Sequence, residues 1–204
     1  MKIHTFNRLT EKSTFPFYKN IKSANFGLVH LINLMGPDVT YVETGVFKGD
    51  SLCHIVQRCP FIKTAIGIDQ YKAYVDDFES KKVSGTYNQD LVDKIKQICL
   101  NNILASGFKN KIQVIEEHTR VAVDNFEDNS IDFLFLDSYC SAKDVEEELE
   151  RWYNKVKING YFAGHDWPYE GVHRSVKEFR SKYDIQSPLS VMGAEWVWLK
   201  KENI

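Results

Sequence analysis

The sequence predicts an α/β protein with a doubly wound, seven-stranded and mostly parallel sheet and helices on both faces. Segments typical of strands and of amphipathic helices alternate from residue 39 onward. The run at 131–137 is almost wholly apolar before its final aspartate, as in a strand buried on both faces of a parallel sheet. Two β-rich runs near the C-terminus are separated only by Gly193 and Ala194, which predicts a terminal antiparallel hairpin. Together these patterns indicate a Rossmann-like fold.

A single domain accounts for the 204 residues. We expect an N-terminal arm and helix over residues 1–38 and the α/β core over residues 39–204. The expected strands are 39–43, 64–69, 111–115, 131–137, 161–165, 185–192 and 195–200. The expected helices are 21–35, 51–59, 90–105, 144–156 and 172–183, with a helical turn or short helix over 121–126.

The spacing of apolar residues predicts which helix faces are buried. The second helix is expected to bury Leu52, Ile55, Val56 and Cys59, and the third Leu91, Ile95, Ile98 and Cys99. Two segments break the alternation of strands and helices: an aromatic-rich arm at 1–20 and a polar, tyrosine-rich connection at 70–88. The arm either packs on the domain surface or covers a substrate, and both segments are candidates to close over one.

Composition narrows the classes of function. The formal net charge of -2 gives no indication of a nucleic-acid partner. Four cysteines without CxxC pairing are typical of reduced thiols. No apolar run is long enough to span a bilayer, so we expect a cytoplasmic protein that acts on a small molecule. The oligomeric state is open, with a homodimer as one option.

The turn after the first strand, Glu43-Thr-Gly45-Val-Phe-Lys-Gly49-Asp50, is of the kind that brings backbone close to a nucleotide-like ligand. Dinucleotide sites use G-x-G-x-x-G, whereas these glycines are four residues apart and Asp50 stands where phosphates would lie. A carboxylate there repels pyrophosphate but not a ligand with a cationic sulfur. Asp69, at the end of the second strand, can accept hydrogen bonds from both ribose hydroxyls of either NAD or S-adenosylmethionine.

Polar residues also follow the later strands. The segment 116–119 either edges an adenine or forms a solvated loop. If the fourth and fifth strands are neighbours, their ends lie about 5 Å apart, and Asp137 and Asp166 could share a hard divalent cation that lowers the pKa of a substrate hydroxyl. Alternatively His165 acts as a general base. In a purely structural reading, Asp166 caps a turn and His165 packs.

At these residues the chain resembles class I S-adenosylmethionine-dependent methyltransferases. The resemblance is to a small family with a Glu-x-Gly first motif and Gly-His-Asp after the fifth strand. The matching pieces, in order, are Val42 to Ser51, Gly67 to Asp69, Ser130 to Asp137, Trp152 to Asp166, and Gly171-Val172 with Val176 and Phe179. They cover about residues 39–200, and the ordered set is more specific than any single piece.

The resemblance implies that the first turn lines the methionine part of the cofactor, that Asp69 binds the ribose, and that the segment around His118 lines the adenine. The predicted cofactor-binding residues are Glu43, Thr44, Gly45, Ser51, Asp69, His118, Thr119 and Asp137. The predicted catalytic residues are Asp137, which would lie beside the transferred methyl, His165 and Asp166. Related metal-dependent O-methyltransferases hold magnesium with acids at the positions of Asp137 and Asp166, which makes these two the predicted metal ligands.

The chain also departs from this family. The family often reads Asp-x-x-His-Ser-Tyr after the fourth strand, where this chain has Asp137-Ser-Tyr-Cys140-Ser-Ala142. Any role of that histidine in metal binding or proton transfer therefore has no counterpart here, because a thiol is a poor ligand for Mg²⁺. Trp167 replaces the amide that completes some related magnesium sites.

The sequence therefore predicts an S-adenosylmethionine-dependent methyltransferase that acts on an oxygen of a small-molecule or sugar-like acceptor, with Mg²⁺ as an optional metal. Two alternatives stay open. One is an NAD-dependent oxidoreductase on a Rossmann-like sheet, which the glycine spacing and Asp50 disfavour. The other is a non-catalytic protein that binds the cofactor or an interaction partner.

Overall fold

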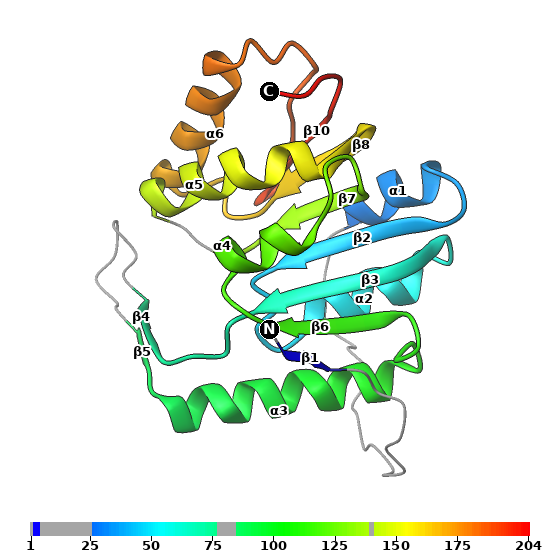
Figure 1. Ribbon diagram of the computed structural model, residues 1–204, viewed down its shortest axis with the longest axis vertical. Helices are drawn as coiled ribbons and strands as arrows, with labels where there is room; N and C mark the ends of the chain where they lie inside the picture. Colours follow the sequence, from blue (N-terminus) through cyan, green and yellow to red (C-terminus); the bar gives the residue numbers. More distant parts are fainter. Residues whose placement is uncertain (1, 5–25, 77–84, 139–140) are drawn as a thin grey trace.

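The computed structural model describes residues 2–4, 26–76, 85–138 and 141–204. Within this part of the chain, eight strands form one mixed sheet in the order β1-β6-β3-β2-β7-β8-β10-β9 (Figure 1). The five strands from β6 to β8 in this order are parallel, and β1, β10 and β9 are antiparallel to their neighbours. The strands are β1 (Lys2–His4), β2 (Val39–Thr44), β3 (Ile62–Asp69), β6 (Ile112–Glu116), β7 (Ile131–Leu136), β8 (Val156–Gly164), β9 (Ser190–Met192) and β10 (Glu195–Leu199).

All seven predicted strands are present, and the C-terminal antiparallel hairpin is confirmed. The arm at 1–20 was predicted to be irregular, but Lys2–His4 adds an eighth strand against β6. The rest of that arm, residues 5–20, lies outside the described residues. The long connection at 70–88 contains a small two-stranded sheet of its own, β4 (Tyr74–Asp76) and β5 (Gly85–Tyr87).

Most predicted strand boundaries agree with the structure to within two residues, but the starts of β8 and β9 are each five residues from the prediction. β8 begins at Val156, so the residues Asn159 and Gly160, which were expected to end a helix, lie inside a strand. Asn159 adopts a positive φ of 65°, and the pairing of β7 with β8 shifts register in this region, which allows the strand to continue past the irregularity. β9 contains only the last three residues of the predicted strand 185–192, because Pro188 near its middle cannot donate a ladder hydrogen bond.

The helices cover both faces of the sheet (Figure 1). They are α1 (Phe26–Leu34), α2 (Asp50–Arg58), α3 (Gln89–Ser106), α4 (Thr119–Ala122), α5 (Ala142–Trp152) and α6 (Glu170–Lys182), with single 3-10 turns at Val123–Asn125 and Tyr153–Lys155. Alternate residues of β2 separate two cores: Tyr41 packs with α1, α2 and α3, whereas Val42 packs with α4, α5 and α6. None of the helices in the described ranges is both long and apolar enough to cross a membrane.

The predicted buried face of α2 is confirmed, since Leu52, Ile55, Val56 and Cys59 are all buried. The prediction for α3 was wrong at two positions: Leu91 and Ile98 are each 40% exposed. The buried stripe instead consists of Val92, Ile95, Cys99 and Ile103. Ile95 and Cys99 belong to both the predicted and the observed buried face. The helix is therefore rotated about its axis relative to the prediction, which brings Val92 and Ile103 into the core in place of Leu91 and Ile98.

The strand order determines which residues meet. β3 and β6 lie on one side of β2, and β7 and β8 lie on the other, so the order of the strands reverses between β2 and β7. Open parallel sheets bind ligands at the carboxyl ends of their strands at such a point. The predicted residues that follow β2, β3, β6, β7 and β8 therefore share one edge of the sheet.

Candidate active site

The turn between β2 and α2 is built around close backbone contacts. Gly45 adopts a φ of 73°, and its N–H donates a hydrogen bond of 2.8 Å to the carbonyl of Ile68 in β3. A Cβ at this position would overlap the backbone carbonyl of Asp137, which follows β7. Glycine is therefore required both by the left-handed backbone and by the close approach of the ends of β2 and β7. Gly49, with a φ of 75°, precedes α2.

Glu43 lies behind this turn and is fully buried. Its carboxylate accepts hydrogen bonds from Tyr41 Oη (2.7 Å) and from Ser51 Oγ of α2. Burial raises the pKa of Glu43 to about 8, although both hydroxyl donors oppose the shift. Glu43 and Ser51 were predicted to contact the cofactor, but the structure directs the two side chains toward each other. Their position supports the turn from within the protein.

Asp69, the last residue of β3, faces the same turn. Its carboxylate accepts hydrogen bonds from the backbone N–H groups of Phe47 (2.9 Å) and Tyr71 (3.0 Å). Burial raises its pKa above the ordinary value. Each carboxylate oxygen has two lone pairs, so both oxygens retain capacity to accept a hydroxyl donor. The side chain is only partly buried, which leaves it accessible at the edge of the sheet.

Asp50 lies at the start of α2, as the sequence predicted, and its side chain is directed toward α3. Its carboxylate accepts a 3.0 Å hydrogen bond from Asn102 Nδ2 of α3, and the same amide nitrogen donates to the carbonyl of Lys48. The charge of Asp50 is thus held against α3. This contact weakens the electrostatic argument that Asp50 excludes a pyrophosphate, and the argument against NAD depends on the glycine spacing alone.

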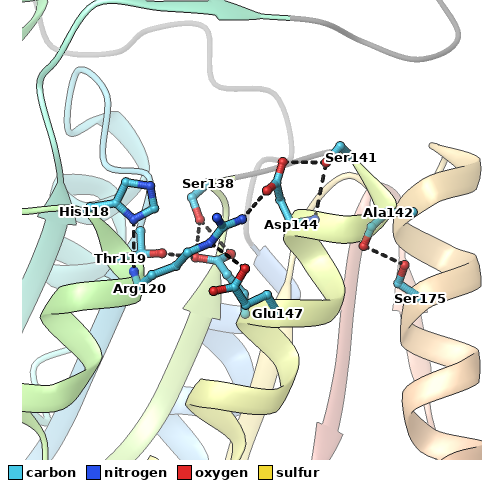
Figure 2. A network of polar contacts seen from close by, with 10 residues as sticks. His118, Thr119, Arg120, Ser138, Ser141, Ala142, Asp144, Glu147 and Ser175 are labelled. Carbon is cyan, nitrogen blue, oxygen red and sulfur yellow. Dashed lines mark hydrogen bonds and ion pairs between the residues drawn. The ribbon is translucent and has the colours of Figure 1, made fainter.

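The residues after β6 lie beside Asp69, because Glu117 N donates to the carbonyl of Asp69. His118 precedes α4, and its Nδ1 accepts a hydrogen bond of 3.2 Å from the backbone N–H of Arg120 (Figure 2). Burial and the charge of Arg120 lower the pKa of His118. The hydroxyl of Thr119, which was predicted to contact the cofactor, instead donates to the buried carboxylate of Glu148 in α5.

Thr44, also a predicted cofactor residue, is buried. Its side chain crosses the switch point, which is the junction between β2 and β7 where the strand order reverses. Its Oγ1 lies 3.0 Å from Ser138 Oγ and accepts a long hydrogen bond of 3.3 Å from Asp137 N. The side chain therefore joins the end of β2 to the residues after β7. In the structure Thr44 contributes to the shape of the site from inside the protein.

The ends of β7 and β8 bring together the three predicted catalytic residues. His165 Nδ1 lies 3.3 Å from Asp137 Oδ1 and 3.0 Å from Asp166 Oδ1. All three side chains are partly exposed, at 27% for Asp137, 35% for His165 and 25% for Asp166. Asp166 adopts a φ of 62°, which turns the chain sharply after His165. The predicted convergence of the two acids and the histidine is thus present.

The protonation of His165 differs from the expectation. Hydrogen bonds to Asp137 and Asp166 raise the pKa of His165 to about 10, so the imidazole is protonated at neutral pH. Burial raises the pKa of Asp137, and His165 opposes this shift. A protonated imidazole cannot accept a proton, so the raised pKa favours the carboxylates over His165 for the role of general base at neutral pH, and His165 in that role stays a prediction. The carboxylates are the groups able to accept a proton at neutral pH.

The same three residues are a candidate metal site. One potential ligand atom from each of Asp137, His165 and Asp166 lies within 4.8 Å of the others. Two carboxylate oxygens suit a hard divalent cation, and the imidazole nitrogen is also a ligand for transition metals such as Mn²⁺ or Zn²⁺. The predicted pair Asp137 and Asp166 is therefore close enough to hold a metal, with His165 as a third donor once it has lost its proton. Residues Tyr139 and Cys140 lie outside the described residues.

Comparison with known proteins identifies the family. A family model described as a methyltransferase domain matches residues 42–167, from within β2 to just beyond Asp166. The chain belongs to this methyltransferase family. A search of curated proteins finds no matching sequence.

Solved structures confirm the class I methyltransferase fold. The O-methyltransferase NovP superposes with a TM-score of 0.61 at 15% identity, covering 86% of this chain and 78% of that chain. An rRNA methylase from Streptococcus thermophilus superposes with a TM-score of 0.61 at 10% identity, covering 90% and 99% respectively. The calicheamicin methyltransferase CalS11 superposes with a TM-score of 0.57 at 14% identity, covering 85% and 76% respectively. Identities this low support the shared fold, whereas the acceptors of these proteins differ.

Sequence reasoning missed two features of the methyltransferase site. The first is Glu148, a buried acid on the apolar face of α5, where it follows Val145 by three residues and precedes Leu149. That position on the predicted buried stripe is the signal that could have revealed it. The second is Trp196 of β10, whose ring lies where a Cβ on Gly164 would be, and whose Nε1 donates a 3.0 Å hydrogen bond to the His165 carbonyl. No spacing rule links Trp196 to this motif.

Proposed function

We propose that this methyltransferase transfers a methyl group from S-adenosylmethionine to an oxygen of a small-molecule acceptor. The observation that carries the proposal is the placement of two different groups at one sheet edge. On one side of the switch point lie the Gly45 turn and the accessible Asp69 carboxylate. On the other side lie Asp137 and Asp166, each within hydrogen-bond reach of His165. The first group suits a nucleoside, and the second suits the handling of a proton.

The residues of the first group fit the cofactor. Gly45 lets the end of β2 pack directly against the backbone of Asp137 after β7, so the ends of the two strands meet at the point where the strand order reverses and where open parallel sheets bind ligands. Asp69 has acceptor capacity for the ribose hydroxyls, and the neighbouring His118 supports an adenine site next to them. When bound, S-adenosylmethionine supplies an electrophilic methyl group on a positively charged sulfur. Asp137 places a carboxylate near that charge.

The chain's own chemistry is then to orient the acceptor and take its proton. The acceptor oxygen attacks the methyl carbon in line with the carbon–sulfur bond, which breaks with its electron pair on sulfur. The hydroxyl proton passes to a carboxylate, and Asp137 and Asp166 are the acids at the right edge of the sheet. Protonated His165 lies between them and fixes their orientation through hydrogen bonds at 3.0–3.3 Å. Proximity and proton removal are the main requirements of such a displacement.

A divalent cation is consistent with the same residues. Asp137 and Asp166 would supply its carboxylate ligands, with His165 beside them. Such a cation would lower the pKa of the acceptor hydroxyl and would replace the proton on His165 as the positive charge between the two acids. Mg²⁺ prefers oxygen ligands, so the imidazole makes Mn²⁺ an equally reasonable occupant.

We propose a small-molecule acceptor from the net charge of the chain and from the solved structures that share its fold. The formal net charge of -2 gives no indication of an RNA acceptor, although an rRNA methylase shares the fold. NovP is an O-methyltransferase and CalS11 is a calicheamicin methyltransferase, and both support a small-molecule acceptor. A cytoplasmic location remains a prediction from the sequence.

Calorimetric titration tests the proposal. We expect S-adenosylmethionine and its demethylated product, S-adenosylhomocysteine, to bind the wild-type protein at one site per chain, and NAD not to bind under the same conditions. Asp69→Asn should weaken both cofactor ligands, whereas Asp124→Asn, an exposed aspartate of the 3-10 turn after α4, should not. Binding of NAD in place of the methyl donor would favour the oxidoreductase alternative. Binding without transfer to any acceptor hydroxyl tested would favour the non-catalytic one.

A further inference from the structure

A buried hydrogen-bond network joins three elements behind the candidate active site. Glu148 of α5 is 2% exposed, and its carboxylate lies 2.7 Å from Ser138 Oγ, in the turn after β7. The same carboxylate accepts a hydrogen bond from Thr119 Oγ1, at the start of α4. Figure 2 shows Thr119 and Ser138 directed toward the same point between α4 and α5. One carboxylate therefore ties α4 and the post-β7 turn to α5.

The chemistry of the groups sets the direction of these hydrogen bonds. An ionised carboxylate only accepts, so Ser138 donates its hydroxyl hydrogen to Glu148. Ser138 Oγ is then free to accept the hydroxyl hydrogen of Thr44, 3.0 Å away. Thr44 Oγ1 in turn accepts the backbone N–H of Asp137. The hydrogen bonds thus form one chain with a single direction: Asp137 donates to Thr44, Thr44 donates to Ser138, and Ser138 donates to Glu148.

Glu148 is surrounded by a charged outer layer. Arg120 of α4 pairs with Asp144 and Glu147 of α5, and among the described residues these three and the titratable His118 lie beside the network (Figure 2). The outer pairs are partly exposed, and Glu147 is 38% exposed. Exposed pairs contribute little compared with a buried carboxylate that holds two hydroxyls. The inner network is therefore the part expected to fix the position of the turn.

We propose that Glu148 is a positioning residue whose ionised carboxylate, acting through Ser138 and Thr44, holds the turn that carries Asp137 and couples it to the start of α4. This inference rests on the proposed function, because the two segments that Glu148 holds, the turn after β7 and the start of α4, are the ones proposed to contact the cofactor. With Glu148 ionised, Asp137 and His118 are held in the arrangement described above. With Glu148 protonated, one of its oxygens carries a hydrogen and becomes a donor, and the negative charge that strengthens the hydrogen bonds from Thr119 and Ser138 is lost.

The charge of Glu148 is expected to change near neutral pH, where its loss would alter these hydrogen bonds. Burial raises its pKa to about 7, while Thr119, Ser138 and Arg120 favour the ionised form and Asp144 opposes it. A difference in cofactor affinity between pH 6 and pH 8 therefore includes a contribution from this residue. Because other groups also titrate in this range, the informative quantity is the difference between the wild type and a variant of Glu148.

The experiment compares S-adenosylhomocysteine affinity in the wild type, Glu148→Gln, Ser138→Ala and the control Glu147→Gln, by calorimetry at pH 6 and pH 8. We expect Glu148→Gln and Ser138→Ala each to weaken binding at pH 8 by about tenfold, since each removes hydrogen bonds to a charged group. Both should show a smaller change with pH than the wild type, which a general loss of stability would not produce. The double variant should be no weaker than the worse single one. Glu147→Gln should behave like the wild type.

The outcomes separate this inference from the proposed function. If the wild type binds and both Glu148→Gln and Ser138→Ala match it in affinity and pH dependence, Glu148 has no positioning role. If Glu148→Gln does not fold, Ser138→Ala alone decides, since it removes the link but keeps the buried acid. If the wild type does not bind the product, the proposed function fails, and the inference fails with it.

Discussion

The protein places two kinds of ionisable group at one edge of its sheet. Glu43 and Glu148 are buried, and each accepts hydrogen bonds from two hydroxyl groups, at least one of them on another element. Asp137, His165 and Asp166 are partly exposed, and His165 contacts the two acids at 3.3 and 3.0 Å respectively. Buried carboxylates with hydroxyl partners hold elements in place, whereas the partly exposed carboxylates beside His165 are better placed to exchange protons with an acceptor. We therefore assign a structural role to the buried acids Glu43 and Glu148, and the handling of the acceptor's proton to Asp137 and Asp166.

The largest expected effect tests the chemical side of this comparison. Asp166→Asn should reduce methyl transfer at least about 100-fold, because an amide accepts no proton and offers a poorer metal ligand. Affinity for S-adenosylhomocysteine should change less than about threefold, since Asp166 lies on the acceptor side. The measurement is transfer of labelled methyl to a panel of phenolic and sugar hydroxyls, with Asp124→Asn as the control. Equal losses of binding and turnover would assign Asp166 to the scaffold instead.

A second prediction tests the scaffold at its tightest point. Gly45→Ala should lower the free energy of unfolding by about 2 kcal/mol or more, because the new Cβ meets the carbonyl of Asp137. Gly107→Ala is the matched control: its φ of 80° is equally strained, but no atom lies within 4 Å of a Cβ there. Urea unfolding of both variants isolates the clash from the backbone strain. Similar losses in the two would show that the ends of β2 and β7 can separate.

A third prediction concerns the cofactor side. Asp69→Asn should weaken S-adenosylhomocysteine binding by about tenfold, since a charged acceptor for the ribose hydroxyls becomes a neutral one. Turnover at saturating cofactor should stay within a few-fold of the wild type. Steady-state kinetics with varied S-adenosylmethionine separates the two effects. A fall in kcat with an unchanged KM would contradict the assignment of Asp69 to binding.

A fourth prediction concerns the pH dependence of stability that the buried Glu43 produces. The pKa of Glu43 is raised to about 8 in the folded protein, so the folded state binds more protons than the unfolded state between about pH 4.5 and 8. Stability should therefore fall as pH rises through this window, by at most about 1.4 kcal/mol per pH unit for one group. Glu43→Gln, which cannot ionise, should flatten the slope. An unchanged slope would mean that Glu43 is solvated in the folded state.

The sequence predicted the fold well because its signals are local. Apolar runs and turn residues located the seven strands, and the position of Asp137 and Asp166 at strand ends was enough to predict that they meet. The faces of α3 were harder, because Leu91 and Ile98 have the same apolar character as the residues actually buried. The β1 strand was missed because three residues carry almost no pattern.

The partners of the site residues could not be predicted, because they depend on elements distant in sequence. Ser51 and Thr119 both stood in cofactor motifs, yet their hydroxyls are bound by Glu43 and Glu148. The raised pKa of His165 depends on how Asp137, at the end of another strand, and its sequence neighbour Asp166 are oriented toward the imidazole, which the spacing of the residues does not indicate. A spacing rule identifies which residues share an edge, but not which of them are already hydrogen-bonded within the protein.

The most direct test is a crystal structure of the complex with S-adenosylhomocysteine. We predict that the ribose hydroxyls contact Asp69, that the adenine lies beside His118, and that the sulfur faces Asp137 and Asp166, with Glu43 and Glu148 still buried. A product molecule bound away from the ends of β2 and β3, or in contact with Glu43, would contradict the division between scaffold and chemistry.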